Sequence, residues 1–296
     1  MADSIKIRLD TSKYAVPTQE DIAEGKRYVL RREQAATMLQ EEIDSILADT
    51  AEKVTTICYQ YGVDPKTFKI SSEYNEDMMR EIADVMDEAE QKILDLINTF
   101  AIPEETSDSN KTALFLWMAM LGKGNRNLHQ TLEGYMNKML ADWEAAIAAL
   151  VSAKAPLSKA TTRIKTYLHS IYTMPEVVEA FKRYTEFAAT YIRSRGVQYG
   201  AVGISNNGST NVVNMGKYTL QMAWMRAQAL AYEENGAVGY YQLRGSNYLC
   251  DVCDSEVGFH PDIEEVFTKA YPHPNCMCFR IPIFTKEQKE FMDSLV

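Results

Sequence analysis

The chain has 296 residues, of which 46% are hydrophobic and 24% charged, with 14 Gly and 9 Pro. This length suits about two domains, and the composition excludes collagen-like, low-complexity and wholly disordered chains. The longest apolar run, 113–121, is shorter than the roughly 20 residues of a membrane-spanning helix. Because the first residues also lack a basic and apolar leader, we expect a cytosolic protein without membrane contact.

The net charge of -10 is unevenly distributed along the chain. Residues 1–150 carry 16 basic and 27 acidic side chains, whereas 151–200 carry 8 and 3. The acidic total disfavours nucleic-acid binding by the whole chain. A local DNA contact through residues 154–195 stays open beside the simpler interpretation, a solvated helix face. The basic side chains of this segment include Lys159, Arg163, Lys165, Lys182, Arg183, Arg193 and Arg195.

The N-terminal third predicts a short strand followed by one long helix. Apolar and polar residues alternate over 5–9, which is typical of a strand. From Thr18, which forms a capping signal with Asp21, apolar residues recur every three to four positions as far as Tyr61. The sequence Gly-Val-Asp-Pro at 62–65 then ends the predicted helix.

Further helices follow, and the periodicity changes near residue 200. A boundary is predicted in the loop-like stretch 196–211, after which a helix and two strands are expected around a cysteine-rich segment. The predicted helices are 75–100, a buried helix at 113–121, 128–151, 157–172, 176–195 beginning near Pro175, and 212–234; the strands are 237–243 and 279–284.

Four of the five cysteines fall within 29 residues, as Cys250-x-x-Cys253 and Cys276-x-Cys278. Two thiolates held by one tight turn grip a metal ion, and a second pair about 20 residues later completes a tetrahedron, which is typical of a closed structural zinc site. His273 precedes the second pair. The intervening segment is short and polar, so we expect zinc to supply much of its folding energy.

Five candidate ligands compete for four positions: Cys250, Cys253, His273, Cys276 and Cys278. The alternation of side chains along a strand does not decide which of His273, Cys276 and Cys278 bind the metal. We favour the set of four ligands without Cys276. Two disulfides are disfavoured in a reducing compartment, and a catalytic zinc is disfavoured because four or five soft ligands indicate closure. A zinc deaminase is rejected because its Pro-Cys-x-x-Cys interval is absent.

Other chemistry-bearing residues have simpler interpretations. Asp254, Glu256 and His260 lie between the two cysteine pairs and are candidates for a metal-dependent nuclease, although solvated loop is the simpler interpretation. Cys58 lies on the apolar stripe of the long helix and is expected to be a small buried side chain. For His129 and His169 we expect surface or helix packing only.

Residues 212–284 resemble the C-terminal signature of phage minor head proteins of the Mu F type. The similarity rests on a helix, a strand, Cys250-x-x-Cys253, Gly258-Phe259 and the sequence His-Pro-Asn-Cys-Met-Cys at 273–278, followed by an apolar strand. It covers about a quarter of the chain. Met277 stands where the family usually has Arg, and 244–248 depart from the acidic and Arg residues that often precede the first Cys.

The resemblance implies a structural head morphogenesis protein of a tailed phage or prophage, without enzymatic activity or a small-molecule substrate. Such a protein associates with portal and capsid proteins during assembly, sometimes with packaged DNA, and is found in the virion head and the host cytoplasm. The alternatives are a zinc-dependent nuclease or toxin and a cellular zinc-binding adaptor. We therefore predict a mainly α fold: a helical domain at 1–199 with a short N-terminal strand, and an α+β zinc-binding module at 200–296.

Overall fold

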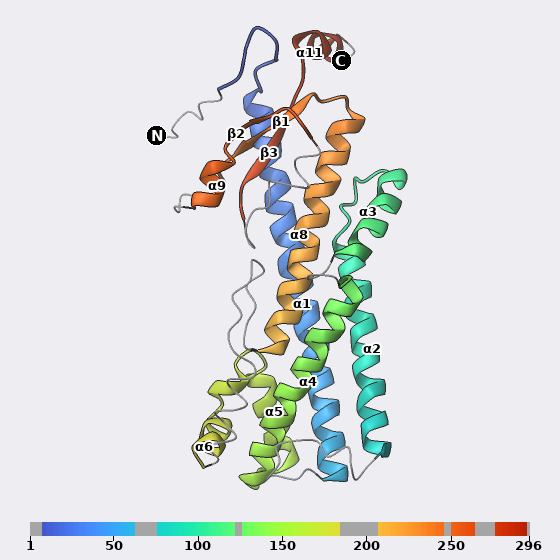
Figure 1. Cartoon of the computed structure of the whole chain (residues 1–296), viewed down its shortest axis with the longest axis vertical. Coiled ribbons are helices and arrows are strands. Elements are labelled where there is room, and N and C mark those ends of the chain that lie inside the picture. Colours follow the sequence, from blue (N-terminus) through green and yellow to red (C-terminus); the bar gives the residue numbers. More distant parts are fainter. Residues whose placement is uncertain are drawn as a thin grey trace. The chain divides into compact units, whose positions relative to one another are not determined.

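The chain folds mainly into long helices, with one small antiparallel sheet near the C-terminus, as the sequence predicts (Figure 1). The computed structural model describes residues 8–62, 76–121, 126–183, 207–245, 250–263 and 276–294, with the backbone alone at 181–183. The elements are α1 Gln19–Tyr61, α2 Glu76–Phe100, α3 Asp108–Met120, α4 Leu128–Ser152, α5 Leu157–Thr166, the 3-10 turn η1 Ile171–Thr173, α6 Pro175–Arg183, α8 Gly208–Glu234, β1 Gly239–Leu243, α9 Asp251–Ser255, β2 Gly258–His260, β3 Phe279–Ile283 and α11 Lys286–Asp293.

The described residues form two compact units. The first, the sheet unit, takes the chain up to Thr37, then Phe100–Leu116, and then the chain from Leu220 onward. The second, the helical unit, takes Met38–Thr99 and Trp117–Thr219. Helices α1 and α8 contribute to both units. The boundary predicted between residues 199 and 200 falls in 184–206, outside the described residues, and stays a prediction.

Helix α1 begins where the capping signal predicts. The Thr18 hydroxyl accepts a hydrogen bond from the Asp21 N–H at 3.1 Å, and the Asp21 carboxylate accepts one from the Thr18 N–H at 2.6 Å. These two bonds satisfy donors that the first helical turn leaves unpaired. The predicted apolar stripe is buried, including Leu39, Ile43 and Leu47 at 0% exposure.

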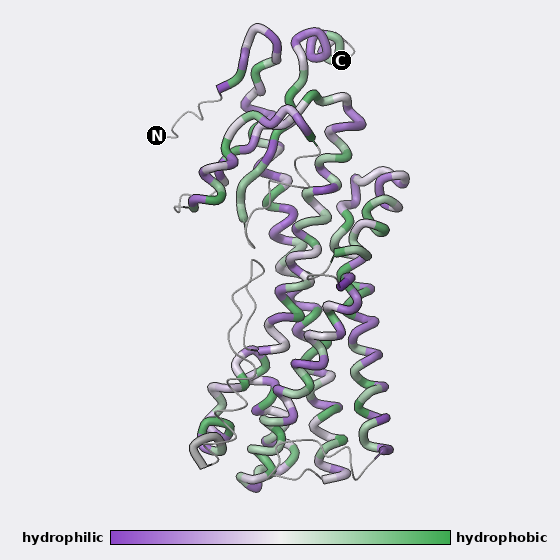
Figure 2. The backbone as a smooth tube through the Cα atoms, viewed as in Figure 1, coloured by the Kyte–Doolittle hydropathy of each residue, from purple (hydrophilic) through white to green (hydrophobic). Residues whose placement is uncertain are grey.

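In the helical unit the helices bury their apolar faces, and a glycine allows two of them to approach closely. The apolar face of α2 is buried along its length, and hydrophobic and hydrophilic residues alternate around this helix (Figure 2). A Cβ at Gly208, the first residue of α8, would lie 2.3 Å from the Met139 backbone nitrogen of α4. Only glycine therefore permits this approach of α8 to α4, and the Gly208 N–H donates to the buried Asp142 carboxylate at 2.7 Å.

The prediction of a buried helix at 113–121 is wrong in its burial. Helix α3 forms there and begins five residues earlier, yet it buries Leu114 and Met118 fully while Leu116 and Met120 are 68% and 70% exposed. The apolar run is continuous rather than periodic, so a helix through it presents apolar side chains on every face. Periodicity, not apolar content, determines which face is covered.

The sheet has the strand order β2-β1-β3, with β1 antiparallel to both neighbours. Tyr241 lies opposite Ile281 and Leu243 opposite Phe279, so their side chains share one face. This face packs against Ile22 and Val29 of α1 in one apolar core. The N-terminal half of α1 therefore covers the sheet (Figure 1).

The outer edge of β3 is protected by two helices. Tyr232 of α8 donates its hydroxyl to the Arg280 carbonyl at 3.0 Å. A Cβ at Gly25 of α1 would lie 2.8 Å from the same carbonyl oxygen, so glycine allows α1 to approach the strand closely. Pro282, which lacks an N–H, suits an edge strand.

The turn from α8 into β1 sets the start of the sheet. The Gly236 N–H donates to the Glu233 carbonyl and the Ala237 N–H to the Tyr232 carbonyl, both at 2.9 Å. This is the hydrogen-bond pattern of a Schellman cap, and Gly236 has the positive φ of 73° that the cap requires. The strand predicted at 237–243 therefore begins at Gly239.

The helix predicted at 157–172 ends earlier, because α5 stops at Thr166 and the separate turn η1 follows. The short elements α9, β2 and α11 are not predicted by the sequence. The 3-residue strand β2 occupies the Gly258-Phe259 position of the signature, and its Phe259 packs against the sheet core. The strand predicted at 5–9 falls mostly outside the described residues, although Leu9 contacts the same core. Among the described helices, none combines the length and apolarity needed to cross a bilayer.

Candidate metal centre

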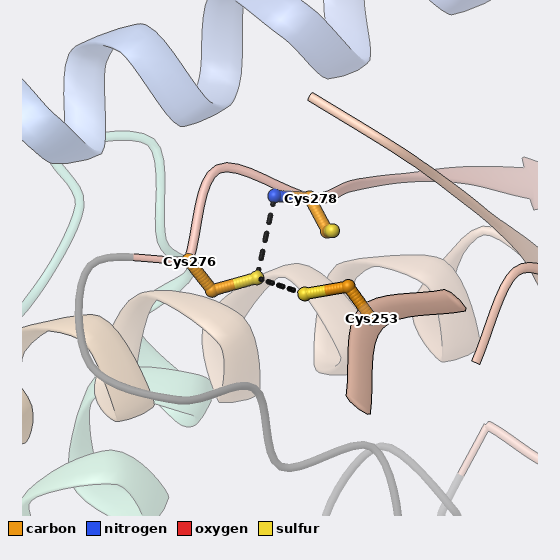
Figure 3. A group of neighbouring side chains, drawn as sticks. All are labelled: Cys253, Cys276 and Cys278. Carbon is orange, nitrogen blue, oxygen red and sulfur yellow. Dashed lines mark hydrogen bonds between the residues drawn. The ribbon is translucent and has the colours of Figure 1, made fainter. Parts of the chain in front are cut away.

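Two short segments of the sheet unit bring the thiols together. Cys250 is the N-cap of α9 and Cys253 lies within that helix, whereas Cys276 and Cys278 lie in the segment that leads into β3. Figure 3 shows the Cys253 and Cys276 side chains pointing toward each other, with Cys278 beside them. The structure therefore joins one residue of the first cysteine pair to both residues of the second.

The three sulfur atoms have the spacing of a metal site. The Sγ atoms of Cys253, Cys276 and Cys278 all lie within 4.8 Å of one another, and the first two are 3.5 Å apart. Four sulfurs placed 2.3 Å from a tetrahedral zinc would be separated by about 3.8 Å. The Cys278 N–H also donates to the Cys276 sulfur at 3.4 Å, which fixes the second pair locally. This cluster could hold a metal ion, with three soft donors already converging.

The thiols of the cluster titrate very differently. Cys253 and Cys276 are buried and Cys278 is half-buried. A hydrogen bond from Cys276 lowers the pKa of Cys278 to about 6, while burial raises the pKa of Cys253 to about 12. Hydrogen bonding to Cys278, followed by burial, raises the pKa of Cys276. Without a cation, the cluster therefore favours one thiolate on Cys278 and opposes a second, so a metal ion would supply the missing positive charge.

Two arginines border the cluster. Arg32 of α1, whose side chain is 3% exposed, donates to the Cys276 carbonyl and pairs with Glu33 at 2.8 Å. Arg244, directly after β1, pairs with the Asp254 carboxylate of α9. Sequence reasoning missed both contacts. The Arg32 contact joins residues 244 positions apart, so no local pattern signals it.

The remaining predicted ligands differ in their positions. The Cys250 sulfur accepts a hydrogen bond from the Cys253 N–H at 3.5 Å and so caps α9. His273 lies outside the described residues. From the sequence we favour a set of four ligands without Cys276. In the structure Cys276 nevertheless lies in the cluster with Cys253 and Cys278. All five cysteines are free in this structure, including the closely spaced Cys253 and Cys276.

The residues proposed for a nuclease have local structural contacts. Asp254 pairs with Arg244. The His260 ring stacks on Tyr240 with centroids 4.7 Å apart, and its Nε2 lies 2.9 Å from the Glu256 carbonyl oxygen. Among the described residues, the group of three or more potential ligands that converges on one point consists of cysteines.

Other candidate residues also have defined environments. Cys58 is fully buried, as predicted, and burial raises the pKa of its thiol to about 12. His129 lies 3.2 Å from Glu90, and His169 lies 2.8 Å from Asp44. These two contacts identify carboxylate partners that the sequence alone did not indicate.

Within the basic segment 154–195, the described cations of α5 face carboxylates. Arg163 lies 3.2 Å from Glu176, Lys159 lies 3.9 Å from the same residue, and Lys165 pairs with Glu52. The other cations that the sequence singles out here fall at 181–195, where no side chain is described. The ion pairs reduce the positive charge that α5 offers to a phosphate.

Comparisons with protein-family models, with curated proteins and with solved structures found no match. The likeness of residues 212–284 to head proteins of the Mu F type therefore stays a prediction from the sequence. The three-cysteine cluster does not depend on that likeness, because it is observed in the structure.

Proposed function

We propose that the cysteine cluster binds one structural zinc ion. Thiolates select soft and borderline metals, and zinc sites in proteins commonly take four such ligands in a closed tetrahedron. Cys253, Cys276 and Cys278 supply three ligands. Cys250, the N-cap of α9, and His273 are the two candidates for the fourth.

The ion would tie α9 to the start of β3. These elements are separated by a long connection in the sequence, and their own apolar contacts are few: Cys253 is the buried residue of α9. A metal that binds the folded arrangement and not the unfolded chain adds its binding free energy to folding. The role that this geometry supports is structural, because buried sulfur ligands leave little room for an exchangeable water.

We further propose that the chain is a minor head protein of a tailed phage or prophage. The observation that carries this proposal is the order of elements in the sheet unit: α8, β1, the first cysteine pair, β2 at Gly258-Phe259, the second pair and β3. That order, with thiols from both pairs in contact, is consistent with the signature that the sequence resembles. The partners are then the portal and capsid proteins, with the protein present in assembling heads.

The test is a tagged pull-down from cells in which the encoding phage or prophage has been induced, with recovered proteins identified by mass spectrometry. We expect the wild-type chain and Cys58→Ala to recover portal and capsid proteins, and Cys253→Ser/Cys276→Ser to recover less. Recovery of neither protein by the wild-type chain would contradict the head-protein proposal. Recovery of a dedicated inhibitor or of nucleic acid alone would favour the nuclease or toxin alternative.

A further inference from the structure

A cavity of about 540 Å³ lies within the sheet unit, away from the cysteine cluster. Its walls come from α1, from the connection between α2 and α3 together with the first turn of α3, from α8 and from the edge strand β3. None of the candidate zinc ligands lines it. A volume of this size matches the pockets that take small molecules.

Gln228 of α8 is the most informative residue in the wall. The residue is 9% exposed, it lines the cavity, and its side chain makes no hydrogen bond with another described residue. The hydroxyl of Thr106, which also lines the cavity, is buried and unpaired. A buried polar atom without a partner is uncommon and costly, so the Thr106 hydroxyl is suited to hydrogen-bond a group that enters the cavity. The unpaired Gln228 amide lines the same cavity and is open to that group.

The charge of the wall is negative. Four carboxylates line the cavity, against the two guanidinium groups of Arg31 and Arg280. Arg31 is engaged by Glu105 at 3.0 Å and by Glu24 at 3.6 Å. The Arg280 guanidinium contacts Gln242 and lies 5.4 Å from the centre of the Tyr240 ring. Glu24 also pairs with Arg27 at 2.8 Å. Among the described residues Asp21 and Glu234 are the carboxylates of the wall outside these ion pairs, and the net charge of the wall favours a cation.

The rest of the wall is apolar and partly aromatic. Tyr28, Tyr232 and Phe284 line the cavity together with alanine and proline side chains. The tyrosine hydroxyls donate to the Trp224 and Arg280 carbonyls, so their rings are held in place. An alkyl chain would pack against these rings, and an ammonium group gains further from an aromatic face.

We propose that this cavity binds an aliphatic amine, a primary ammonium group on a short alkyl chain such as a diamine or triamine. The ammonium donates to the Gln228 amide oxygen and to the carboxylates, and the alkyl chain contacts the aromatic wall. This proposal does not depend on the zinc site or on a role in phage heads.

Titration calorimetry of the full chain with 1,5-diaminopentane at physiological salt tests the proposal, with 1,5-pentanediol as the uncharged probe. We expect saturable binding of one diamine and no binding of the diol. Gln228→Leu and Glu105→Gln should each weaken diamine binding by roughly tenfold or more, the loss of about one hydrogen-bonded or charged contact. Ala231→Met, which fills the cavity without changing its charge, should abolish binding.

The matched control is Glu88→Gln, which removes a carboxylate paired with Lys53 and Lys92 in the helical unit. Its affinity should equal that of the wild-type chain. Equal affinity in all four variants would overturn the proposal, since general attraction to a chain of charge -10 would then explain the binding. Absence of diamine binding to the wild-type chain, or equal binding of the diol, would overturn it as well.

Discussion

Arg32 holds the backbone of the cysteine cluster from the other end of the sequence. Its guanidinium is almost fully buried, which is costly unless its donors are satisfied. The Nη2 group donates to the Cys276 carbonyl and to the Glu33 carboxylate, and Nε donates to the same carboxylate. The contact fixes the carbonyl of one cluster residue to α1, so the orientation of the second cysteine pair depends on a residue that carries no metal-binding chemistry.

Arg32→Met should therefore lower the free energy of unfolding by about 1.5–3 kcal/mol, the usual cost of losing a hydrogen bond from a charged group to a buried acceptor. Urea unfolding measures this change. The control is Arg27→Met, whose exposed guanidinium pairs with Glu20 and Glu24. Because exposed ion pairs contribute little to stability, this variant should cost clearly less than Arg32→Met. Equal costs for the two variants would contradict the role of Arg32.

Glu90 of α2 makes the stability of the helical unit depend on pH. Burial raises the pKa of its carboxyl, and its Oε1 lies 3.2 Å from His129 Nε2 without a hydrogen bond. The folded pKa therefore exceeds the unfolded pKa, and folding takes up a proton between the two values. The stability contributed by this group is present at low pH and lost as the pH rises through the folded pKa.

Glu90→Gln removes that titration. The variant should gain stability relative to the wild-type chain as the pH rises from 4 to 7, measured as the difference between urea midpoints at each pH. Glu88→Gln is the control, because a hydrogen bond from Lys92 lowers the pKa of Glu88, so that variant should lose relative stability over the same range. A difference between the urea midpoints of Glu90→Gln and the wild-type chain that does not change with pH would contradict a raised pKa for Glu90.

At the scale of elements, periodicity predicts the long helices and says little about the short pieces. Caps and apolar stripes locate α1, α2 and α4 to within a residue or two, because each stripe must be buried. The short elements α9 and β2 have too few residues for a period to be read. Their positions depend on contacts with distant parts of the chain, such as the pairing of β2 with β1.

Close contact between α1 and β3 depends on one small residue. At Gly25 a Cβ would lie 2.8 Å from the Arg280 carbonyl oxygen and 2.9 Å from Phe279 Cδ2. Gly25→Ala should therefore cost about 1–3 kcal/mol of unfolding free energy, because the helix and strand must move apart. Urea unfolding of the full chain measures the loss.

Gly134→Ala in α4 is the matched substitution. Its Cβ would meet only the flexible end of Arg126, at 3.0 Å, and alanine favours helix over glycine by up to about 1 kcal/mol. We expect this variant to be slightly stabilised. The same change at two helical positions should thus have opposite signs, and equal signs would argue against close packing at Gly25.

At the scale of the whole molecule, the cysteine cluster belongs to the sheet unit, while α4 lies entirely within the helical unit. If the cluster holds zinc as we propose, chelation should therefore expose the amides of β1 and β3 to hydrogen exchange, while those of α4 between Met139 and Leu150 keep their protection. Exchange followed by mass spectrometry at peptide resolution measures both regions in one sample. Loss of protection in α4 alone would contradict a stabilising metal in the sheet unit.

The sequence predicts the mainly helical fold, the small C-terminal sheet and the meeting of the two cysteine pairs. It does not predict that Cys276 joins the cluster while Cys250 caps α9. Alternation along a strand places Cys276 and Cys278 on the same side and leaves the choice to the loop geometry around them. The Arg32 contact and the cavity beside Gln228 depend on segments far apart in the sequence, for which no spacing rule exists.

The measurement that tests the central claim most directly is the metal content of the purified full chain by inductively coupled plasma mass spectrometry. We predict close to one zinc per wild-type chain and per Cys58→Ala chain, and a large loss in Cys253→Ser and Cys276→Ser. X-ray absorption at the zinc edge should show at least three sulfur ligands at about 2.3 Å. A wild-type chain that contains no metal, and whose unfolding does not change when zinc is added, would contradict the claim.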